Sequence, residues 1–128
     1  SRDGTKVAKK QKKINKTTMF KNFPMYVDKS IKLMSSNEVN KLGELFHLSW
    51  QDKKKLPYTS NKKLDKIYEK AINSGAVGGK LLGVGGGGFF LFLVPFKKQL
   101  SFKKKMKKFL ITSLSVDNEG AIATRVKI

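Results

Sequence analysis

Apolar side chains recur at helical spacing in three successive stretches of the chain, which predicts three amphipathic helices. The first helix is expected to begin near Phe23, because Pro24 is tolerated only in a first turn. The third can be capped by Ser60 or Asn61 and stopped by Gly75 in a left-handed conformation. The inward positions of the three helices are Phe20, Phe23, Val27, Ile31 and Met34; Val39, Leu42, Leu45, Phe46, Ser49 and Trp50; and Leu64, Ile67, Tyr68, Ala71 and Ile72.

After Gly75 the pattern changes to short apolar runs, which predict β-strands at residues 80–84 and 89–94. The second run is apolar on both faces, so this strand is expected at the centre of a sheet. The remaining expected elements are a weakly periodic helix at residues 1–16, a basic helix at 97–110, and two short strands at 114–117 and 121–128. The basic helix is expected to bury Leu100, Phe102, Met106 and Phe109. This order predicts an α+β fold, an antiparallel sheet with helices packed on one side.

Most glycines of the chain lie between Gly75 and Gly88, directly before the largest apolar run. Residues 83–88 match the dinucleotide-binding pattern G-x-G-x-x-G, but that site requires a helix after the loop, and a strand is predicted here. A Walker A loop is excluded, since Ser74 rather than a glycine lies six residues before Lys80 and no Ser or Thr follows the lysine. Successive glycine N–H groups can bind phosphate, and the alternative role is a flexible linker. The apolar run that follows favours a strand, a glycine loop and a second strand.

Residues 75–95 read GAVGGKLLGVGGGGFFLFLVP and resemble the third signature motif of the GHMP-type small-molecule kinases, which include galactokinase, homoserine kinase, mevalonate kinase and phosphomevalonate kinase. The residues of this stretch are most similar to those of the sugar-kinase branch that contains D-glycero-D-manno-heptose 7-phosphate kinase. Upstream segments agree with this branch, namely residues 45–50 (LFHLSW), 53–56, 60–61, 64–65 and 67–71. The resemblance covers nearly the whole chain but only the C-terminal part of such a kinase. Residues 1–128 are therefore interpreted as a C-terminal domain without the N-terminal nucleotide-binding half.

The resemblance implies a ferredoxin-like core and phosphoryl transfer from ATP, with Mg²⁺, to a sugar or sugar phosphate, with heptose 7-phosphate as the expected substrate. The family carries its acidic base and its Pro-x-x-x-Gly-Leu-Gly-Ser-Ser phosphate loop in the N-terminal half, and neither has a match here. No catalytic residue and no metal ligand are therefore assigned, and the chain alone is expected to be inactive. The expected partners are ATP, the sugar phosphate and the N-terminal half of the same kinase, and the oligomeric state is left open.

In the resembling kinases the third motif lies beside the loop that binds the nucleotide phosphates. This role carries over to Gly83, Gly85, Gly86, Gly87 and Gly88. Four side chains are candidate substrate contacts, namely Lys80, Trp50, Lys53 and Asp65. Structural alternatives are a surface strand residue for Lys80, a core residue for Trp50 and a first-turn helix carboxylate for Asp65. Val84 stands where the family often has alanine, which can crowd the loop.

The chain carries 28 Lys and Arg residues against nine Asp and Glu residues, a net charge of +19. This charge raises the alternative of a non-enzymatic nucleic-acid-binding module. Almost all of the positive charge is lysine spread over every segment, whereas base readout favours arginine, so nucleic acid is not the expected partner. The basic face of residues 97–110 can also contact an anionic membrane, but a solvated helix face is the favoured interpretation, so no membrane partner is expected.

The sequence contains no cysteine, which excludes disulfides and thiolate metal sites. Its single histidine, His47, is expected to be a packed structural imidazole rather than a metal ligand. The apolar run at residues 89–94 is far shorter than the roughly 20 residues that cross a bilayer, and no signal peptide is recognisable. A cytoplasmic protein is therefore expected.

Overall fold

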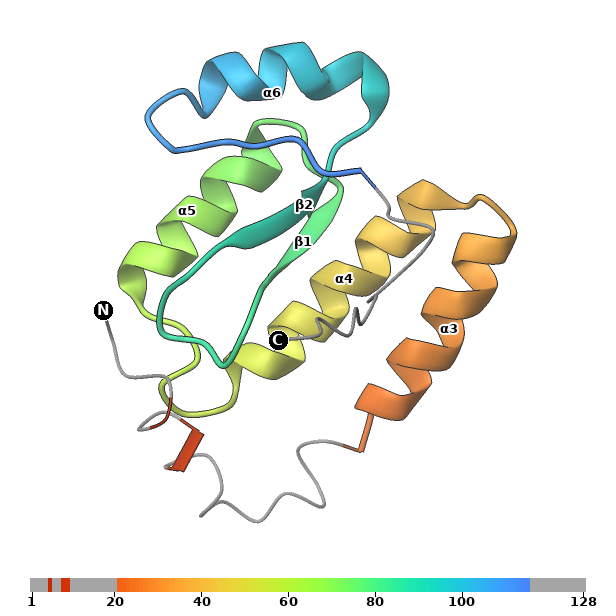
Figure 1. Cartoon of the computed structure of the whole chain (residues 1–128), viewed down its shortest axis with the longest axis vertical. Coiled ribbons are helices and arrows are strands. Elements are labelled where there is room, and N and C mark those ends of the chain that lie inside the picture. The colour runs from red at the N-terminus through yellow and green to blue at the C-terminus, as the bar shows by residue number, and fades with distance from the viewer. Residues whose placement is uncertain (1–4, 6–7, 10–20, 116–128) are drawn as a thin grey trace, which may run out of the picture.

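The computed structural model describes residue 5, residues 8–9 and residues 21–115 (Figure 1). Within these ranges the elements follow in the order α3 (Phe23–Ser35), α4 (Val39–Lys54), α5 (Lys62–Asn73), β1 (Gly78–Leu81), β2 (Phe90–Leu93), η1 (Phe96–Lys98) and α6 (Gln99–Lys105). Helices combined with an antiparallel pair of strands confirm the predicted α+β class. The strand predicted at residues 121–128 lies outside the described residues. So does most of the helix predicted at residues 1–16, of which Thr5, Ala8 and Lys9 are described and helical.

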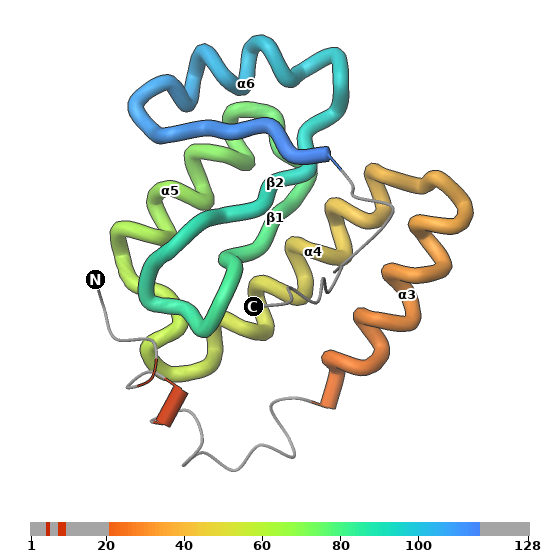
Figure 2. The backbone as a smooth tube through the Cα atoms, viewed as in Figure 1, coloured from red at the N-terminus to blue at the C-terminus, as the bar shows by residue number. Residues whose placement is uncertain are grey.

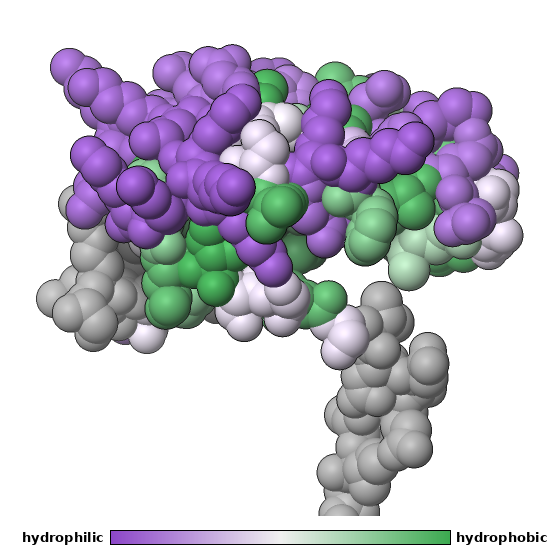
Figure 3. Space-filling view, turned by 90° about the horizontal axis from the view of Figure 1, so that it is seen from above, coloured by the Kyte–Doolittle hydropathy of each residue, from purple (hydrophilic) through white to green (hydrophobic). Residues whose placement is uncertain are grey.

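The two strands form a hairpin that lies among the helices (Figure 2). Helix α4 runs beside β1, and α3 packs on α4 away from the hairpin. Helix α5 lies beside β2 in this view and meets α4 through the contacts of Tyr68 with His47 and Trp50. Helix α6 crosses one end of the hairpin above α5. Seen from the α6 end, hydrophilic side chains cover one side of the molecule and hydrophobic side chains gather towards the opposite side (Figure 3).

Helix α3 begins, and helix α5 begins and ends, where the local signals predict. Helix α3 starts at Phe23 with proline in its first turn, where the missing N–H group is harmless. Asn61 caps α5, and its side-chain oxygen accepts hydrogen bonds from the N–H groups of Lys63 and Leu64 at 3.0 and 3.1 Å. Gly75 follows α5 with φ 117°, the left-handed stop that the sequence predicts.

Helix α3 contains no buried residue, and its predicted inward positions Val27, Ile31 and Met34 are exposed, which contradicts that prediction. A polar cluster around Asp52 joins α3 to α4. The Asp52 carboxylate accepts hydrogen bonds from the Tyr26 hydroxyl at 2.5 Å and from Asn22 Nδ2 at 3.2 Å, and it pairs with Lys55 Nζ at 2.6 Å. Hydrogen bonds from Lys55, Tyr26 and Asn22 lower the pKa of Asp52 from 3.8 to about 2. The side chain of Asp52 is 16% exposed, so this cluster is only partly screened by water.

Strand β1 starts two residues earlier than predicted and ends at Leu81 rather than at residue 84. The reason lies in packing, since glycine has a low intrinsic preference for strands. A Cβ atom on Gly78 would lie 1.8 Å from the Gly43 carbonyl oxygen, and one on Gly79 would lie 2.4 Å from both Leu91 O and Phe92 Cδ1. Only glycines allow α4 and the Phe92 ring to approach β1 this closely.

Strand β2 pairs with β1 in antiparallel register, from Gly78 opposite Leu93 to Leu81 opposite Phe90. The prediction of a central strand buried on both faces is wrong for the described residues. All four residues of β2 are only half-buried, and within the described ranges β1 is its one hydrogen-bonded neighbour. Phe90 and Phe92 pack into the core, and the intervening Leu91 alternates to the other face of the hairpin.

The core consists of two clusters of buried residues that share Ile72 and Phe92 as partly buried neighbours. Their members are Trp50, Leu64, Tyr68 and Leu81 in the first, and Ala71, Ala76, Phe102 and Met106 in the second. The Trp50 ring meets the edge of Phe90 at a centroid distance of 5.5 Å. Helices α4 and α5 thereby share one core with the hairpin, and α6 closes its end.

The basic segment after β2 is a 3₁₀ turn followed by a helix that ends at Lys105, shorter than the predicted span of residues 97–110. Phe102 and Met106 are buried and Phe109 is partly buried, as predicted. Leu100 is 69% exposed, which contradicts the prediction, because residues two apart such as Leu100 and Phe102 do not share a helix face. Of the strand predicted at residues 114–117, residues 114 and 115 are described and lie in no strand.

Candidate nucleotide-phosphate loop

The glycine loop, residues 82–89, joins β1 to β2 as a tight bend. The N–H of Leu82 donates to Phe89 O at 2.9 Å, which extends the antiparallel pairing to the base of the loop. Positive φ angles follow in quick succession, at Gly83, Gly85, Gly86 and Gly88, with values of 77°, 108°, 77° and 115°. A side chain at these positions would be strained, so the bend explains the glycines. A segment paired at both ends is not a linker, and the predicted order of strand, loop and strand is confirmed.

One side of the glycine loop packs on the connection between α4 and α5. The buried Gly86 donates its N–H to Thr59 O at 2.8 Å, and Thr59 itself is fully buried. A Cβ atom on Gly85 would lie 2.7 Å from Thr59 Cα and 2.9 Å from Thr59 O. Thr59 could not be predicted from the sequence, because a contact made through its main chain leaves no pattern in residue types.

The other side of the glycine loop is open. A Cβ atom on Gly83 or on Gly87 would meet no heavy atom within 4 Å. Three apolar residues around this open side are exposed, namely Leu82, Val84 and Phe89. The N–H of Gly86 already donates to the carbonyl oxygen of Thr59, and this hydrogen bond helps to close the loop. The phosphate role of Gly83, Gly85, Gly86, Gly87 and Gly88 stays a prediction.

The two candidate lysines, Lys53 and Lys80, lie beside the glycine loop and strand β1. Lys53 Nζ donates to Gly83 O at 2.5 Å and to Leu81 O at 3.4 Å, so it binds the loop itself. Burial lowers the pKa of Lys53, and the nearby charge of Lys80 lowers it further. Lys80 Nζ lies over the Phe46 ring, 5.8 Å from its centroid, at the side of an apolar groove of about 570 Å³ between α3 and α4. The structure therefore brings the two cations near each other but turns them to different neighbours.

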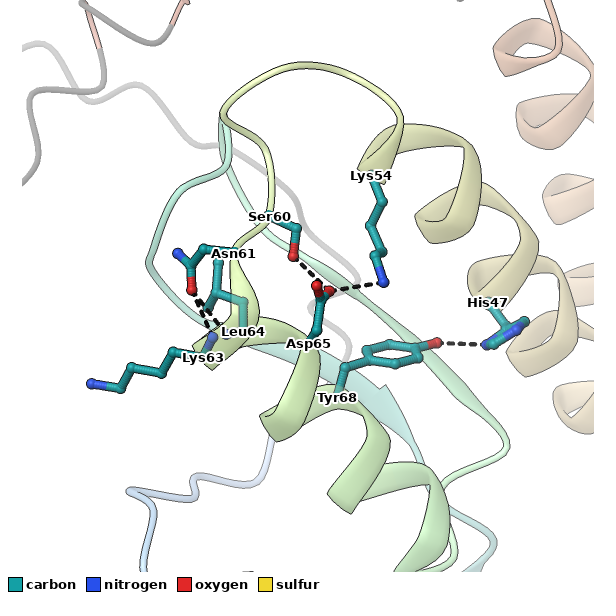
Figure 4. A network of polar contacts seen from close by, with 8 residues as sticks. All are labelled: His47, Lys54, Ser60, Asn61, Lys63, Leu64, Asp65 and Tyr68. Carbon is teal, nitrogen blue, oxygen red and sulfur yellow. Dashed lines mark hydrogen bonds and ion pairs between the residues drawn. The ribbon is translucent and has the colours of Figure 1, made fainter.

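Trp50 and Asp65 are both engaged within the domain. Trp50 is 0% exposed, and its Nε1 finds no hydrogen-bond partner in the part of the chain that is described, so its position supports the core role rather than substrate stacking. Asp65 Oδ1 accepts from Ser60 Oγ and pairs with Lys54 Nζ, both at 2.8 Å (Figure 4). Burial alone would raise the pKa of Asp65, but the hydrogen bonds from Lys54 and Ser60 outweigh it and lower the pKa. Asp65 thus ties the end of α4 to the first turn of α5.

His47 takes the structural place that the sequence predicts. Its Nδ1 lies 2.9 Å from the hydroxyl of Tyr68 (Figure 4). This hydroxyl also donates to Gly79 O at 3.3 Å. Burial raises the pKa of Tyr68 to about 12, although the hydrogen bond to Gly79 partly offsets this effect. The pair connects α4 and α5 to the middle of β1.

Residues 5, 8–9 and 21–115 contain no group of three or more His, Cys, Asp or Glu residues placed to hold a metal ion. No Mg²⁺ ligand is therefore assigned to them. Among the helices described, none combines the length and the apolar character needed to span a membrane.

A known protein family matches the part of the chain that contains the glycine loop and most of the helices around it. The family described as GHMP kinases C terminal matches residues 30–112, from within α3 to beyond α6. The chain belongs to the GHMP kinase C-terminal family. This match confirms the resemblance that the glycine motif carried.

A curated relative narrows the comparison within the GHMP kinases. The chain is 34% identical over 88 residues to D-glycero-alpha-D-manno-heptose 7-phosphate kinase of Campylobacter jejuni. The match covers 66% of this chain and 26% of the relative. This GHMP kinase domain therefore spans about a quarter of the length of the enzyme that it resembles.

Proposed function

We propose that this chain is the C-terminal portion of an ATP-dependent sugar kinase that phosphorylates a sugar phosphate of the heptose 7-phosphate class. The observation that carries the proposal is the family match over residues 30–112, which includes the bent glycine loop with its open side. The named relative, a heptose 7-phosphate kinase, supports the substrate class.

The surroundings of the glycine loop fit an anionic ligand. The chain of glycine peptide units offers N–H groups at an open surface, and the ammonium groups of Lys53 and Lys80 add positive potential nearby. ATP supplies the phosphoryl group that is transferred, and the contribution proposed for the glycine loop is to bind and orient its phosphates. Positioning and charge neutralisation are the main requirements of phosphoryl transfer.

The remaining machinery is proposed to come from the N-terminal half of the same kinase. That half would supply the acidic base, the second phosphate-binding loop and the ligands of Mg²⁺, because the described residues contain no cluster that suits a metal ion. This arrangement makes the N-terminal half the principal macromolecular partner of the chain. Because the proposed reaction consumes ATP, we place it in the cytoplasm.

The test compares the isolated chain with the full-length protein in an ADP-release assay with ATP, Mg²⁺ and heptose 7-phosphate. We expect release of ADP by the full-length protein and none above background by the isolated chain. Robust metal-dependent turnover by the isolated chain would contradict the division of labour between two halves. A folded full-length protein that phosphorylates neither heptose 7-phosphate nor other sugar phosphates would overturn the kinase proposal itself.

A further inference from the structure

Three consecutive lysines end α4, and each has a different partner. Lys54 pairs with Asp65 at 2.8 Å and Lys55 pairs with Asp52 at 2.6 Å, so both bind carboxylates of the domain. Lys53 forms no ion pair with a carboxylate of the described residues and instead directs its ammonium group to the main chain of β1 and the glycine loop. The run is therefore more than a solvated helix end.

We propose that Lys53 is a positioning residue, whose ammonium group fixes the bend of the glycine loop by binding the carbonyl oxygens of Gly83 and Leu81. Its contact to Gly83 is 2.5 Å long and its contact to Leu81 is 3.4 Å long. Thr59 holds the same loop from a second point through its carbonyl bond to Gly86 N–H at 2.8 Å. The loop is thus bound at two points, by Lys53 at the end of α4 and by Thr59 in the connection to α5.

An ammonium group suits this position because two carbonyl oxygens converge on it and its surroundings are partly dry. Hydrogen bonds from a charged donor contribute more than neutral ones, and partial burial strengthens them. Lys53 is half-buried, and burial is the main cause of its lowered pKa. Gly83 itself adopts a φ of 77°, and a Cβ atom there would meet no heavy atom within 4 Å, so Gly83 is not held in place by packing around its own Cα.

The role rests on the proposed function only in so far as the glycine loop serves nucleotide phosphates. A side chain that binds the loop from its packed side is a support for the site and not a ligand of the substrate. Lys53 therefore changes from a candidate substrate contact into the residue that presets the shape of the loop. Its effect on the loop can be measured without any turnover.

The experiment is amide hydrogen exchange by NMR on the 128-residue chain, comparing Lys53→Met with Lys66→Met. Lys66 is exposed on α5, so its replacement removes the same charge without touching the loop. We expect the hydrogen-bonded amides of Leu82 and Gly86 to exchange about tenfold faster in Lys53→Met, as the loss of a charged hydrogen bond implies. Amides in the middle of α5 should be unchanged, and Lys66→Met should match the unsubstituted chain. Equal exchange at Leu82 and Gly86 in both variants overturns the proposal.

Two further measurements separate positioning from general stability. Lys53→Arg retains a charged donor and should restore slow exchange at Leu82 and Gly86, whereas failure to restore it in a folded variant counts against the ammonium contact. In the unsubstituted chain, ¹⁵N NMR should show a slowly exchanging Lys53 ammonium signal, unlike that of exposed Lys66. Absence of this signal overturns the proposal even if Lys53→Met does not fold. Because neither readout involves ATP or sugar, a failed kinase assay would not be mistaken for a failed loop contact.

Discussion

Replacing Gly85 by alanine is expected to destabilise the chain, whereas the same replacement at Gly87, two residues further on, is expected to be neutral or slightly stabilising. The two glycines belong to the same loop and look equivalent in the sequence. In the structure Gly85 lies against the main chain of Thr59, and Gly87 faces open space. The pair therefore tests directly whether the loop has one packed side and one open side.

The magnitude at Gly85 has two parts. Its φ of 108° is a conformation that L-residues rarely adopt, and such strain costs about 1–3 kcal/mol. The new Cβ would lie 2.7 Å from Thr59 Cα, a main-chain atom that cannot rotate away, and overpacking of this kind costs about 1–3 kcal/mol. The expected loss is therefore about 2–6 kcal/mol, a large part of the roughly 5–15 kcal/mol that stabilises an ordinary domain. Gly87 has no positive φ and no neighbour within 4 Å, so alanine there should change stability by less than about 1 kcal/mol.

The assay is urea unfolding followed by far-ultraviolet circular dichroism, with unchanged m-values as the check that both variants unfold in the same way. A loop that relaxes away from Thr59 would lower the loss at Gly85, and faster exchange of the Gly86 amide would reveal that movement. Equal unfolding free energies for the Gly85 and Gly87 variants, with equal exchange at Gly86, would refute the two-sided loop.

Three further predictions concern the contacts around the loop and the helices that support it. Because the folded-state pKa of Asp52 is depressed from 3.8 to about 2, its carboxylate stabilises the fold above about pH 4 by at most ~2.5 kcal/mol, less after solvent screening, and this contribution is lost as the pH falls towards 2. Asp52→Asn should flatten that part of the pH profile of thermal unfolding, and an unchanged profile would contradict the cluster. Tyr68→Phe removes the hydroxyl that contacts His47 and Gly79, so a loss of about 1–3 kcal/mol is expected in urea unfolding, and no loss would mean that water replaces it. Gly86→Val in the full-length protein should strongly reduce turnover by distorting the loop, and normal kinetics in a folded variant would speak against any role of the loop in the reaction.

Signals that act within a few residues predicted the described fold well. A proline fixes the start of α3, the Asn61 side chain caps α5, and Gly75 ends it, because each effect is settled by the residue and its immediate neighbours. The bend at residues 82–89 also followed from local chemistry, since only glycines tolerate its run of positive φ angles. Local preference therefore determined where the chain turns.

Contacts between segments that are distant in the chain could not be predicted from the sequence. Gly78 and Gly79 look unsuited to a strand, yet they begin β1 because α4 and Phe92 approach the main chain there. Lys53 and the carbonyl of Gly83 are 30 residues apart, and nothing in either residue type indicates the other. The aromatic run of β2 indicated burial correctly for Phe90 and Phe92 but overstated it for the strand as a whole, because apolar character alone does not count the neighbours of a strand.

The glycines of this domain therefore do two different kinds of work, which composition cannot separate. Gly78, Gly79 and Gly85 permit close approach, since a Cβ on any of them would collide with the main chain of Gly43, Leu91 or Thr59. Gly83 and Gly87 collide with nothing, so their lack of a side chain does not serve the packing of the domain. Gly83 still requires glycine for its backbone angle, but Gly87 has neither a positive φ nor a neighbour that excludes a side chain. A bare main chain at Gly87 would be explained by a ligand that comes close to it, and the proposed function places the phosphates of ATP there.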